Sequence, residues 1–304
     1  MPRSAHIFTS EKQDERLDRR IPNNPARGAH RSRPGRVYRG SEIQVRSILT
    51  TYSVLEIYVA VLHCAFRSEV LELSSSLTAI VPERVAARGT LYLLHGLSDD
   101  DSMWVRQTNI ERYASARGLA VVMPQVHRSY YSDEVHGGAY WSFLSDELPR
   151  IVERVFNVPS SRDRSFVAGL SMGGYGAMKW ALRHPERFAA AASLSGALGL
   201  AARTRPGPGS LDAGLWDRIF DNRSIVGGAD DVLALLQPVA NPRDTPVLYV
   251  CCGVDDPLFH ENETFVRMAD EMQIPVQVEF GPGAHTWDYW DREIEKVIAW
   301  LPVP

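Results

Sequence analysis

A glycine-flanked serine lies near the middle of this chain, between an apolar strand pattern and a helical pattern. The strand pattern covers Ser165–Ala168 and the helical pattern covers Gly173–Arg183, with Gly-Leu-Ser-Met-Gly joining them. A chain that turns from strand to helix at one residue crowds the positions two before and two after the turn, where only glycine avoids a collision. Gly169 and Gly173 occupy those positions around Ser171. The segment therefore predicts a strand–turn–helix unit with the serine at its tip.

Strand and helix patterns alternate over most of the chain around this unit. Such alternation is typical of a mostly parallel sheet with helices on both faces, so the sequence predicts an α/β fold. The expected strands are Thr90–Leu94, Leu119–Met123, Ser165–Ala168, Ala189–Leu194, Pro246–Cys252 and Pro275–Phe280. The expected helices are Asn109–Arg117, Leu144–Phe156, Gly173–Arg183, Glu263–Met272 and Trp290–Leu301. Three earlier segments are expected to open the sheet as antiparallel strands: Val61–Phe66, Glu69–Leu73 and Leu77–Val81.

The strand–turn–helix unit also indicates chemistry. A G-x-S-x-G match alone is weak evidence, because so short a motif occurs by chance. Here a strand precedes the motif and a helix follows it, as a nucleophile elbow requires. This context predicts the α/β-hydrolase fold with Ser171 as nucleophile, at a helix N-terminus whose free N–H groups favour negative charge. A Ser-Gly turn without chemistry is the alternative.

Two backbone N–H donors are needed to hold a tetrahedral oxyanion beside the serine. The first is expected to be the N–H of Met172, the residue after the nucleophile. The second is expected from Leu97, because Leu94–Leu97 (Leu-His-Gly-Leu) ends an early strand and Gly96 allows the backbone to approach closely. His136–Gly138 (His-Gly-Gly) is an alternative oxyanion element, but it lies in a polar loop well past the preceding strand.

The base and the acid are expected after the serine, in the chain order serine, acid, histidine. His285 lies between the last strand and the last helix, where an exposed base is expected, whereas His260 is interpreted as a surface residue. The strand Pro246–Cys252 leads into Asp255 and Asp256. Both are candidates for the acid that accepts a hydrogen bond from the imidazole and fixes its tautomer. Periodicity does not separate the two aspartates.

Five segments together resemble the putative esterase family. They are Leu94–Leu97, Gly169–Gly176, Ala192–Ala197, Cys252–Asp256 and His285–Trp290. That family includes tributyrin-type acyl esterases, S-formylglutathione hydrolases, feruloyl and acetylxylan esterases, and mycolyltransferases, and the likeness is greatest to the small tributyrin-type esterases. It covers the chain from about Val59 to the C-terminus.

The resemblance implies site residues. The family's triad falls on Ser171, Asp256 and His285, which favours Asp256 over Asp255, and its oxyanion donors fall on Leu97 and Met172. One departure concerns the substrate. Formylglutathione hydrolases usually carry histidine at the positions of Leu170 and Tyr175 here.

The expected activity is that of a serine carboxylesterase acting on short-chain acyl esters through an acyl-enzyme, with no metal or organic cofactor. A thioesterase similar to S-formylglutathione hydrolase and an acyltransferase are the alternatives, and the triad alone does not exclude an amidase or peptidase. A catalytically silent binding module is the alternative from another class. Trp104, Tyr140 and Trp141 are candidate walls of the substrate pocket.

The chain is expected to divide into a disordered basic tail at 1–57 and a catalytic domain at 58–304. Met1–Gly40 contains ten Lys or Arg against four Asp or Glu and no sustained apolar period. An N-terminus assigned too far upstream, or a nucleic-acid-binding arm, is an alternative explanation for the tail. Within the domain, Pro and Gly interrupt the strand–helix rhythm at about 200–241, which predicts a cap-like insertion near the active site.

Composition limits the partners and the compartment. The net charge of −4 gives no reason to expect nucleic acid or an acidic membrane as partner. Cys64, Cys251 and Cys252 fit neither a disulfide framework nor a zinc site. With no apolar signal segment, we expect a cytoplasmic protein without membrane contact whose partner is a small-molecule ester. The sequence leaves open whether it forms homo-oligomers.

Overall fold

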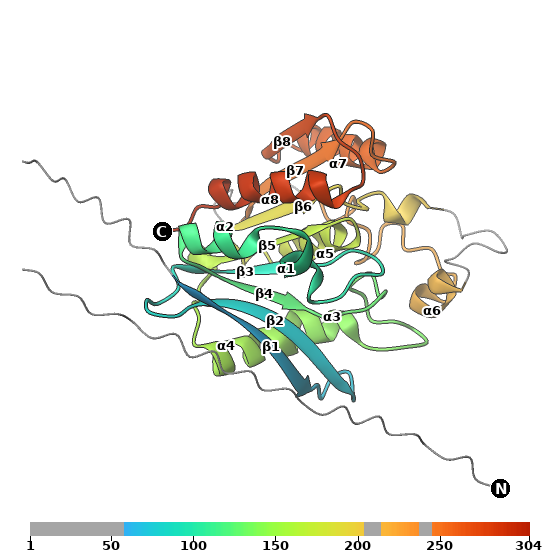
Figure 1. The fold of residues 1–304 in the computed structure, drawn as a ribbon. Helices are drawn as coiled ribbons and strands as arrows, with labels where there is room; N and C mark the ends of the chain where they lie inside the picture. The colour runs from blue at the N-terminus through green and yellow to red at the C-terminus, as the bar shows by residue number, and fades with distance from the viewer. Residues whose placement is uncertain (1–57, 204–213, 237–244) are drawn as a thin grey trace, which may run out of the picture. The chain divides into compact units, whose positions relative to one another are not determined.

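The computed structural model describes residues 58–203, 214–236 and 245–304, which are built around an eight-stranded sheet (Figure 1). The strands are β1 (Val59–Arg67), β2 (Ser74–Pro82), β3 (Gly89–Leu94), β4 (Leu119–Pro124), β5 (Ser165–Leu170), β6 (Ala190–Leu194), β7 (Val247–Gly253) and β8 (Val276–Gly281). Their order in the sheet is β1-β2-β4-β3-β5-β6-β7-β8. β2 pairs antiparallel with β1 and β4, and all other pairs are parallel. The predicted mostly parallel α/β sheet is confirmed.

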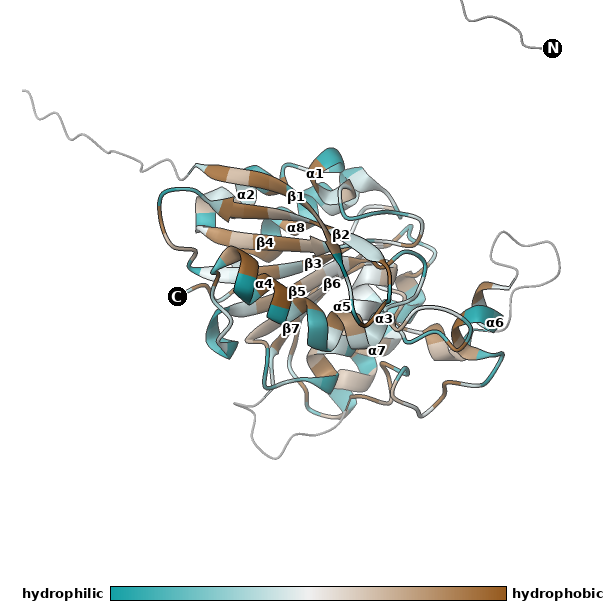
Figure 2. Cartoon of the chain, turned by 90° about the horizontal axis from the view of Figure 1, so that it is seen from below, coloured by the Kyte–Doolittle hydropathy of each residue, from teal (hydrophilic) through white to brown (hydrophobic). Residues whose placement is uncertain are grey.

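Helices cover both faces of this sheet, and Figure 2 shows the brown, apolar strands between them. The helices are α1 (Met103–Gln107), α2 (Ile110–Arg117), α3 (Tyr140–Ser142), α4 (Leu148–Phe156), α5 (Met172–Arg183), α6 (Leu215–Phe220), α7 (Phe259–Glu271) and α8 (Trp287–Trp300). A π-helical turn at Phe143–Glu147 joins α3 to α4. α1, α2 and α8 contribute to the apolar core on one face, while α4, α5 and α7 contribute to the core on the other.

The central strands are apolar on both faces because both faces are covered. Alternate residues of β3 show this division: Leu91 and Leu93 join the core beneath α2 and α8, whereas Tyr92 and Leu94 join the core beneath α5. β3, β4, β5 and β6 are buried along their whole length. Continuous apolar runs in the sequence therefore mark these strands well.

The prediction of a strand at Glu69–Leu73 is wrong. Glu69–Leu73 forms the bend that joins β1 to β2, because the pairing of Arg67 with Ser74 leaves the residues between them as the hairpin loop. The N–H of Ser68 donates to the carbonyl of Leu73 at 2.9 Å and closes this loop. The alternation of side chains there reflects a half-exposed loop rather than a strand.

The topology places several loops at one edge of the sheet. Parallel strands end at the same edge, so the loops after β3, β5, β6, β7 and β8 come together there. The predicted tail at 1–57 lies outside the described residues, and the predicted insertion is described only to residue 203 and over 214–236. Within this insertion, Asp231–Leu236 forms hydrogen-bonded turns, not a helix. None of the helices in the described ranges is long and apolar enough to cross a lipid bilayer.

Candidate active site

Ser171 occupies a strained turn between β5 and α5. Its φ is +54° and its ψ is −115°, a conformation that residues with a side chain rarely adopt. A Cβ atom at Gly169 would lie 2.4 Å from the carbonyl oxygen of Gly173, and one at Gly173 would lie 2.3 Å from the carbonyl oxygen of Leu94. The first clash would be with the helix and the second with the end of β3. These are the collisions that the glycine spacing predicts.

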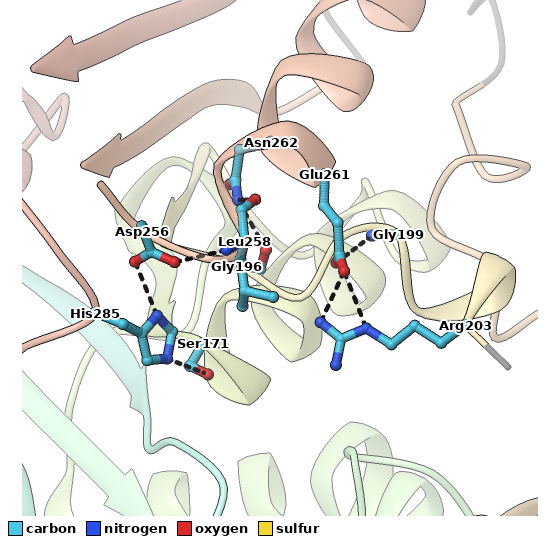
Figure 3. Close-up of polar contacts among 9 residues, drawn as sticks. All are labelled: Ser171, Gly196, Gly199, Arg203, Asp256, Leu258, Glu261, Asn262 and His285. Atoms are coloured by element: carbon cyan, nitrogen blue, oxygen red, sulfur yellow. Dashed lines mark hydrogen bonds and ion pairs between the residues drawn. The ribbon is translucent and has the colours of Figure 1, made fainter. Parts of the chain in front are cut away.

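His285 and Asp256 lie beside the serine in one line of hydrogen bonds (Figure 3). The Nε2 atom of His285 is 3.0 Å from the Ser171 Oγ, and its Nδ1 is 2.8 Å from the Asp256 Oδ2. A carboxylate only accepts, so the imidazole hydrogen lies on Nδ1 and Nε2 is free to accept from the serine hydroxyl. The side chain of Asp256 is fully buried, while that of His285 is 28% exposed.

The environment keeps Asp256 ionised. Burial alone would raise the pKa of Asp256, but hydrogen bonds from the His285 ring and from the N–H of Leu258 hold that pKa below its ordinary value. The Leu258 N–H donates to Oδ1 at 2.8 Å, so both carboxylate oxygens have a donor. The carboxylate is therefore a fixed negative charge behind the imidazole.

Backbone contacts between two loops decide which aspartate meets His285. The N–H of Val254 donates to the Gly281 carbonyl at 2.9 Å, and the N–H of Asp255 donates to the Gly283 carbonyl at 3.0 Å. A Cβ atom at Gly253 would lie 2.1 Å from the same Gly283 oxygen. In this register the side chain of Asp255 is exposed, whereas that of Asp256 turns inward to the imidazole.

The loop after β6 is held by hydrogen bonds on the other side of Asp256, as Figure 3 also shows. Glu261 on α7 accepts the N–H of Gly199 at 2.9 Å, and its other carboxylate oxygen takes two nitrogens of Arg203 at 2.8 and 3.0 Å. The amide of Asn262 donates to the Gly196 carbonyl at 2.9 Å. These contacts fix the segment that begins at Gly196 next to Ser171.

Trp290 contacts the ring of His285. The sequence patterns did not single out this tryptophan, although it ends the His285–Trp290 segment. Its ring meets the imidazole edge-on, with 4.8 Å between the ring centroids and 88° between the planes. Its indole N–H donates to the Oγ of Ser195 at 3.2 Å. Trp290 is in the first turn of α8, so that helix supports the orientation of His285.

The loop after β3 holds the Gly96–Leu97 peptide in a fixed orientation. The N–H of Val126 donates to the Nε2 of His95 at 3.2 Å, so the imidazole hydrogen of His95 lies on Nδ1 and donates to the Gly96 carbonyl at 2.8 Å. Burial lowers the pKa of His95 and keeps the ring neutral. Within the described residues, no protein acceptor takes the N–H of Leu97 or of Met172.

Two alternatives from the sequence lie elsewhere. His136 belongs to a loop that packs on α6: its N–H donates to the Arg218 carbonyl at 2.9 Å, and its ring lies 3.2 Å from Asp221. His260 is on α7, in a cleft of about 820 Å³ between α7 and β8, and pairs with Glu263. Neither side chain takes part in the hydrogen-bond line at Ser171.

The candidate pocket residues are all buried. Trp104 has no exposed surface, and its indole N–H donates to the Leu94 carbonyl at 3.1 Å, so it supports the end of β3 rather than lining a cavity. Trp141 stacks on His184 at the far end of α5, about 20 Å from Ser171 at 1.5 Å per residue. Tyr140 packs edge-on against His127. Within the described residues, no hydrogen bond or ring contact joins any of the three to Ser171 or His285, so their role as pocket walls stays a prediction.

Comparisons with known proteins agree with this architecture. The family described as "Putative esterase" matches residues 79–301. An acetyl esterase of Caldicellulosiruptor saccharolyticus is 29% identical, over 80% of this chain and 98% of that protein. Two Staphylococcus aureus structures are each 34% identical. FphF, a fluorophosphonate-binding serine hydrolase, has a TM-score of 0.74 over 80% of this chain and 98% of its own. The S-formylglutathione hydrolase FrmB has a TM-score of 0.71 over 81% and 99%.

The family match covers well over half of the chain, and two solved relatives exceed 30% identity along nearly their whole length. Both comparisons point to the same class of enzyme, and the α/β-hydrolase fold expected from the sequence is confirmed. The chain belongs to the putative esterase family and is a serine hydrolase of the carboxylesterase class.

Proposed function

We propose that this protein is a serine carboxylesterase that hydrolyses short-chain acyl esters through a Ser171–His285–Asp256 triad and an acyl-enzyme intermediate. The observation that carries the proposal is the unbroken hydrogen-bond line from the Asp256 carboxylate through the His285 ring to the Ser171 hydroxyl. The strained φ of Ser171 supports it, because backbone strain at a polar residue between a strand and a helix is typical of a nucleophile elbow.

The proposed reaction has two halves. In the first, His285 Nε2 takes the Ser171 proton as Oγ attacks the ester carbonyl, and the alcohol leaves with that proton. In the second, water attacks the acyl-enzyme with His285 again as base, which releases the acid and restores the serine. Asp256 keeps the imidazole in one tautomer and stabilises the imidazolium. The N–H groups of Leu97 and Met172 hold the oxyanion in both halves, and no cofactor takes part.

Thioester hydrolysis is the second candidate, because FrmB is an S-formylglutathione hydrolase. Two residues argue against it. Leu170 and Tyr175 stand where formylglutathione hydrolases usually carry histidine, and both are buried. The Tyr175 hydroxyl is engaged by the carbonyl of Asp230 at 2.8 Å. A short acyl ester remains the better-supported substrate, in line with the acetyl esterase relative.

The test compares wild type with Ser171→Ala on p-nitrophenyl acetate, butyrate and octanoate. We expect kcat to fall by about 10⁶-fold on removal of the nucleophile, with the rate greatest on the shorter esters. Circular dichroism of both proteins checks that the variant is folded. A folded wild type that is inert on all three esters would overturn the proposal. A kcat/KM that is far higher for S-formylglutathione would favour the thioesterase, and acylated products formed with an added acceptor alcohol would favour an acyltransferase.

A further inference from the structure

A fully buried lysine lies on the helix that follows the nucleophile. Lys179 has no exposed surface, and its Nζ donates to the Tyr131 carbonyl at 2.8 Å and to the Ser132 Oγ at 2.8 Å. It also forms an ion pair with the Asp230 carboxylate. An ammonium group has three hydrogens, so these three acceptors satisfy it. The amine is engaged on every side, and the proposed reaction gives it no chemical step.

The loop that Lys179 holds is strained. Tyr130 and Tyr131 both have positive φ angles, +49° and +51°, and tyrosine adopts this region rarely. Such backbone persists only where its surroundings enforce it. Two contacts enforce the conformation of Tyr131. Its carbonyl accepts a hydrogen bond from Lys179, and its ring fills the space at Gly176, where an added Cβ atom would lie 2.5 Å from that ring.

The third contact of Tyr131 reaches the loop after β3. Its phenol hydroxyl donates to the His95 carbonyl at 2.8 Å. The ring of the same His95 donates to the Gly96 carbonyl, which belongs to the peptide that carries the Leu97 N–H. A displacement of Tyr131 would therefore move the backbone on which the proposed oxyanion donor sits.

The acidic partner comes from the segment 214–236. Tyr175 and Lys179 are four residues apart and lie on the same face of α5. The Tyr175 hydroxyl donates to the Asp230 carbonyl at 2.8 Å, while Lys179 pairs with the Asp230 carboxylate. Asp230 is thus held by its backbone and by its side chain. The contacts run without a break from this segment, through Lys179 and Tyr131, to His95.

We propose that Lys179, Asp230 and Tyr131 are positioning residues for the reaction. They fix the loop after β3, which carries His95 and the proposed oxyanion donor Leu97, by joining it to α5 and to the segment 214–236. This inference rests on the proposed role of the Leu97 N–H. None of the three residues touches the reacting atoms. They act through His95 on the position of the Leu97 N–H. Their effect should be greatest in the transition state, when negative charge develops on the substrate oxygen.

The first experiment is Tyr131→Phe, which deletes one hydroxyl and keeps the ring. We expect kcat to fall by about 10-fold with KM unchanged within about twofold, since misplacement of a catalytic group by a fraction of an ångström lowers the rate rather than substrate binding. An alkyl trifluoromethyl ketone, whose adduct with Ser171 carries the oxyanion, should bind more weakly by the same factor. Tyr92→Phe is the matched control, because Tyr92 is a buried core tyrosine on β3 outside these contacts.

The second experiment tests the connection to Asp230. Substitution of the buried Lys179 side chain is expected to unfold the chain, because it would leave the three acceptors of its Nζ without their donor, so Asp230→Asn is used instead. We expect kcat to fall about 10-fold in this variant too, and the double variant with Tyr131→Phe to fall by clearly less than the product of the two factors, because both changes act through one loop. Unchanged kcat in Tyr131→Phe, an unchanged inhibitor affinity, or strictly multiplied factors would overturn the inference. If any of these occurs while Ser171→Ala is inactive, the proposed function still stands. Retained activity in Ser171→Ala would instead remove the proposed function itself.

Discussion

On one side of Ser171, the loops that carry Asp256 and His285 are joined to each other by backbone hydrogen bonds and by the close approach of Gly253 to Gly283. On the other side, the loops that carry His95 and Tyr131 are joined by buried side chains. The first arrangement depends on the conformation of the backbone in these two loops. The second depends on a small number of polar groups whose hydrogen bonds must all be made, because an unpaired polar group is costly when buried.

This difference predicts how each side responds to substitution. On the side of Asp256 and His285, which we call the acid–base side after their proposed roles, either of these two side chains can be replaced without moving the backbone, so such a substitution should remove chemistry and little else. On the side of His95 and Tyr131, removal of one polar group leaves its partners unpaired. The effect of a single substitution should therefore extend to the residues that are joined to it by hydrogen bonds.

The largest effect that separates the two sides should come from Asp256→Asn. The amide keeps the shape but donates where the imidazole needs an acceptor, so His285 is held in the wrong tautomer and kcat is expected to fall by about 10⁴-fold. Asp255→Asn is the matched control, because the exposed neighbour makes no contact with His285, and its kcat should stay within about twofold of wild type. Steady-state rates on p-nitrophenyl acetate measure both. Equal losses in the two variants would contradict the assignment of the acid.

A smaller effect is expected from Gly253→Ala. The added Cβ would meet backbone atoms of Gly283 at 2.1 Å, so the two loops must separate, and we expect a lower melting temperature and a loss of about 100-fold in kcat. Gly281→Ala serves as the comparison, since a Cβ there meets nothing within 4 Å. Thermal unfolding and kcat are measured together. A Gly253→Ala enzyme with wild-type activity would show that the backbone contact between Gly253 and Gly283 does not position Asp256 against His285.

The smallest effect concerns pH. Burial lowers the pKa of Lys179 to about 8, with Arg183 lowering it further and Asp230 and Asp133 opposing the shift. As the pH rises through that value the lysine loses its charge and the ion pair weakens, so kcat should decline on the alkaline side. Asp230→Asn removes a carboxylate that raises this pKa, and the decline should then begin at lower pH. The check is kcat between pH 6 and 10 for both proteins, corrected for spontaneous hydrolysis. A decline at the same pH in both would contradict the role of Asp230.

Local patterns predicted the strands and the elbow because each depends mainly on residues that are neighbours in the chain. The glycines around Ser171 indicate a crowded turn, and the continuous apolar runs of β3 to β6 indicate strands that are buried on both faces. The choice between Asp255 and Asp256 is different, since it depends on how the loop after β7 meets the loop after β8. Residue spacing left it open, and only the resemblance favoured Asp256, the aspartate that the structure brings to His285.

The residues that local patterns missed are those whose surroundings come from distant segments. A lysine in the middle of α5 is expected to reach solvent, and Lys179 is buried only because Tyr131, Ser132 and Asp230 supply its acceptors. Trp104 and Trp141 were candidate walls of the substrate pocket, and both are buried. Their positions depend on contacts with Leu94 and His184, which no sequence period records.

The glycines of the elbow have a consequence for how such an enzyme changes over evolution. Side chains at Gly169, Gly173, Gly174 or Gly176 would each come within 2.6 Å of a neighbouring atom, and the residues between them are buried apart from the serine itself. Almost no heritable variation can be accepted at these four glycines without disturbing the fold. New substrate preferences must therefore arise at the positions between these glycines, such as Leu170 and Tyr175, or in the loops around the elbow, and a combinatorial library aimed at specificity should leave the four glycines unchanged.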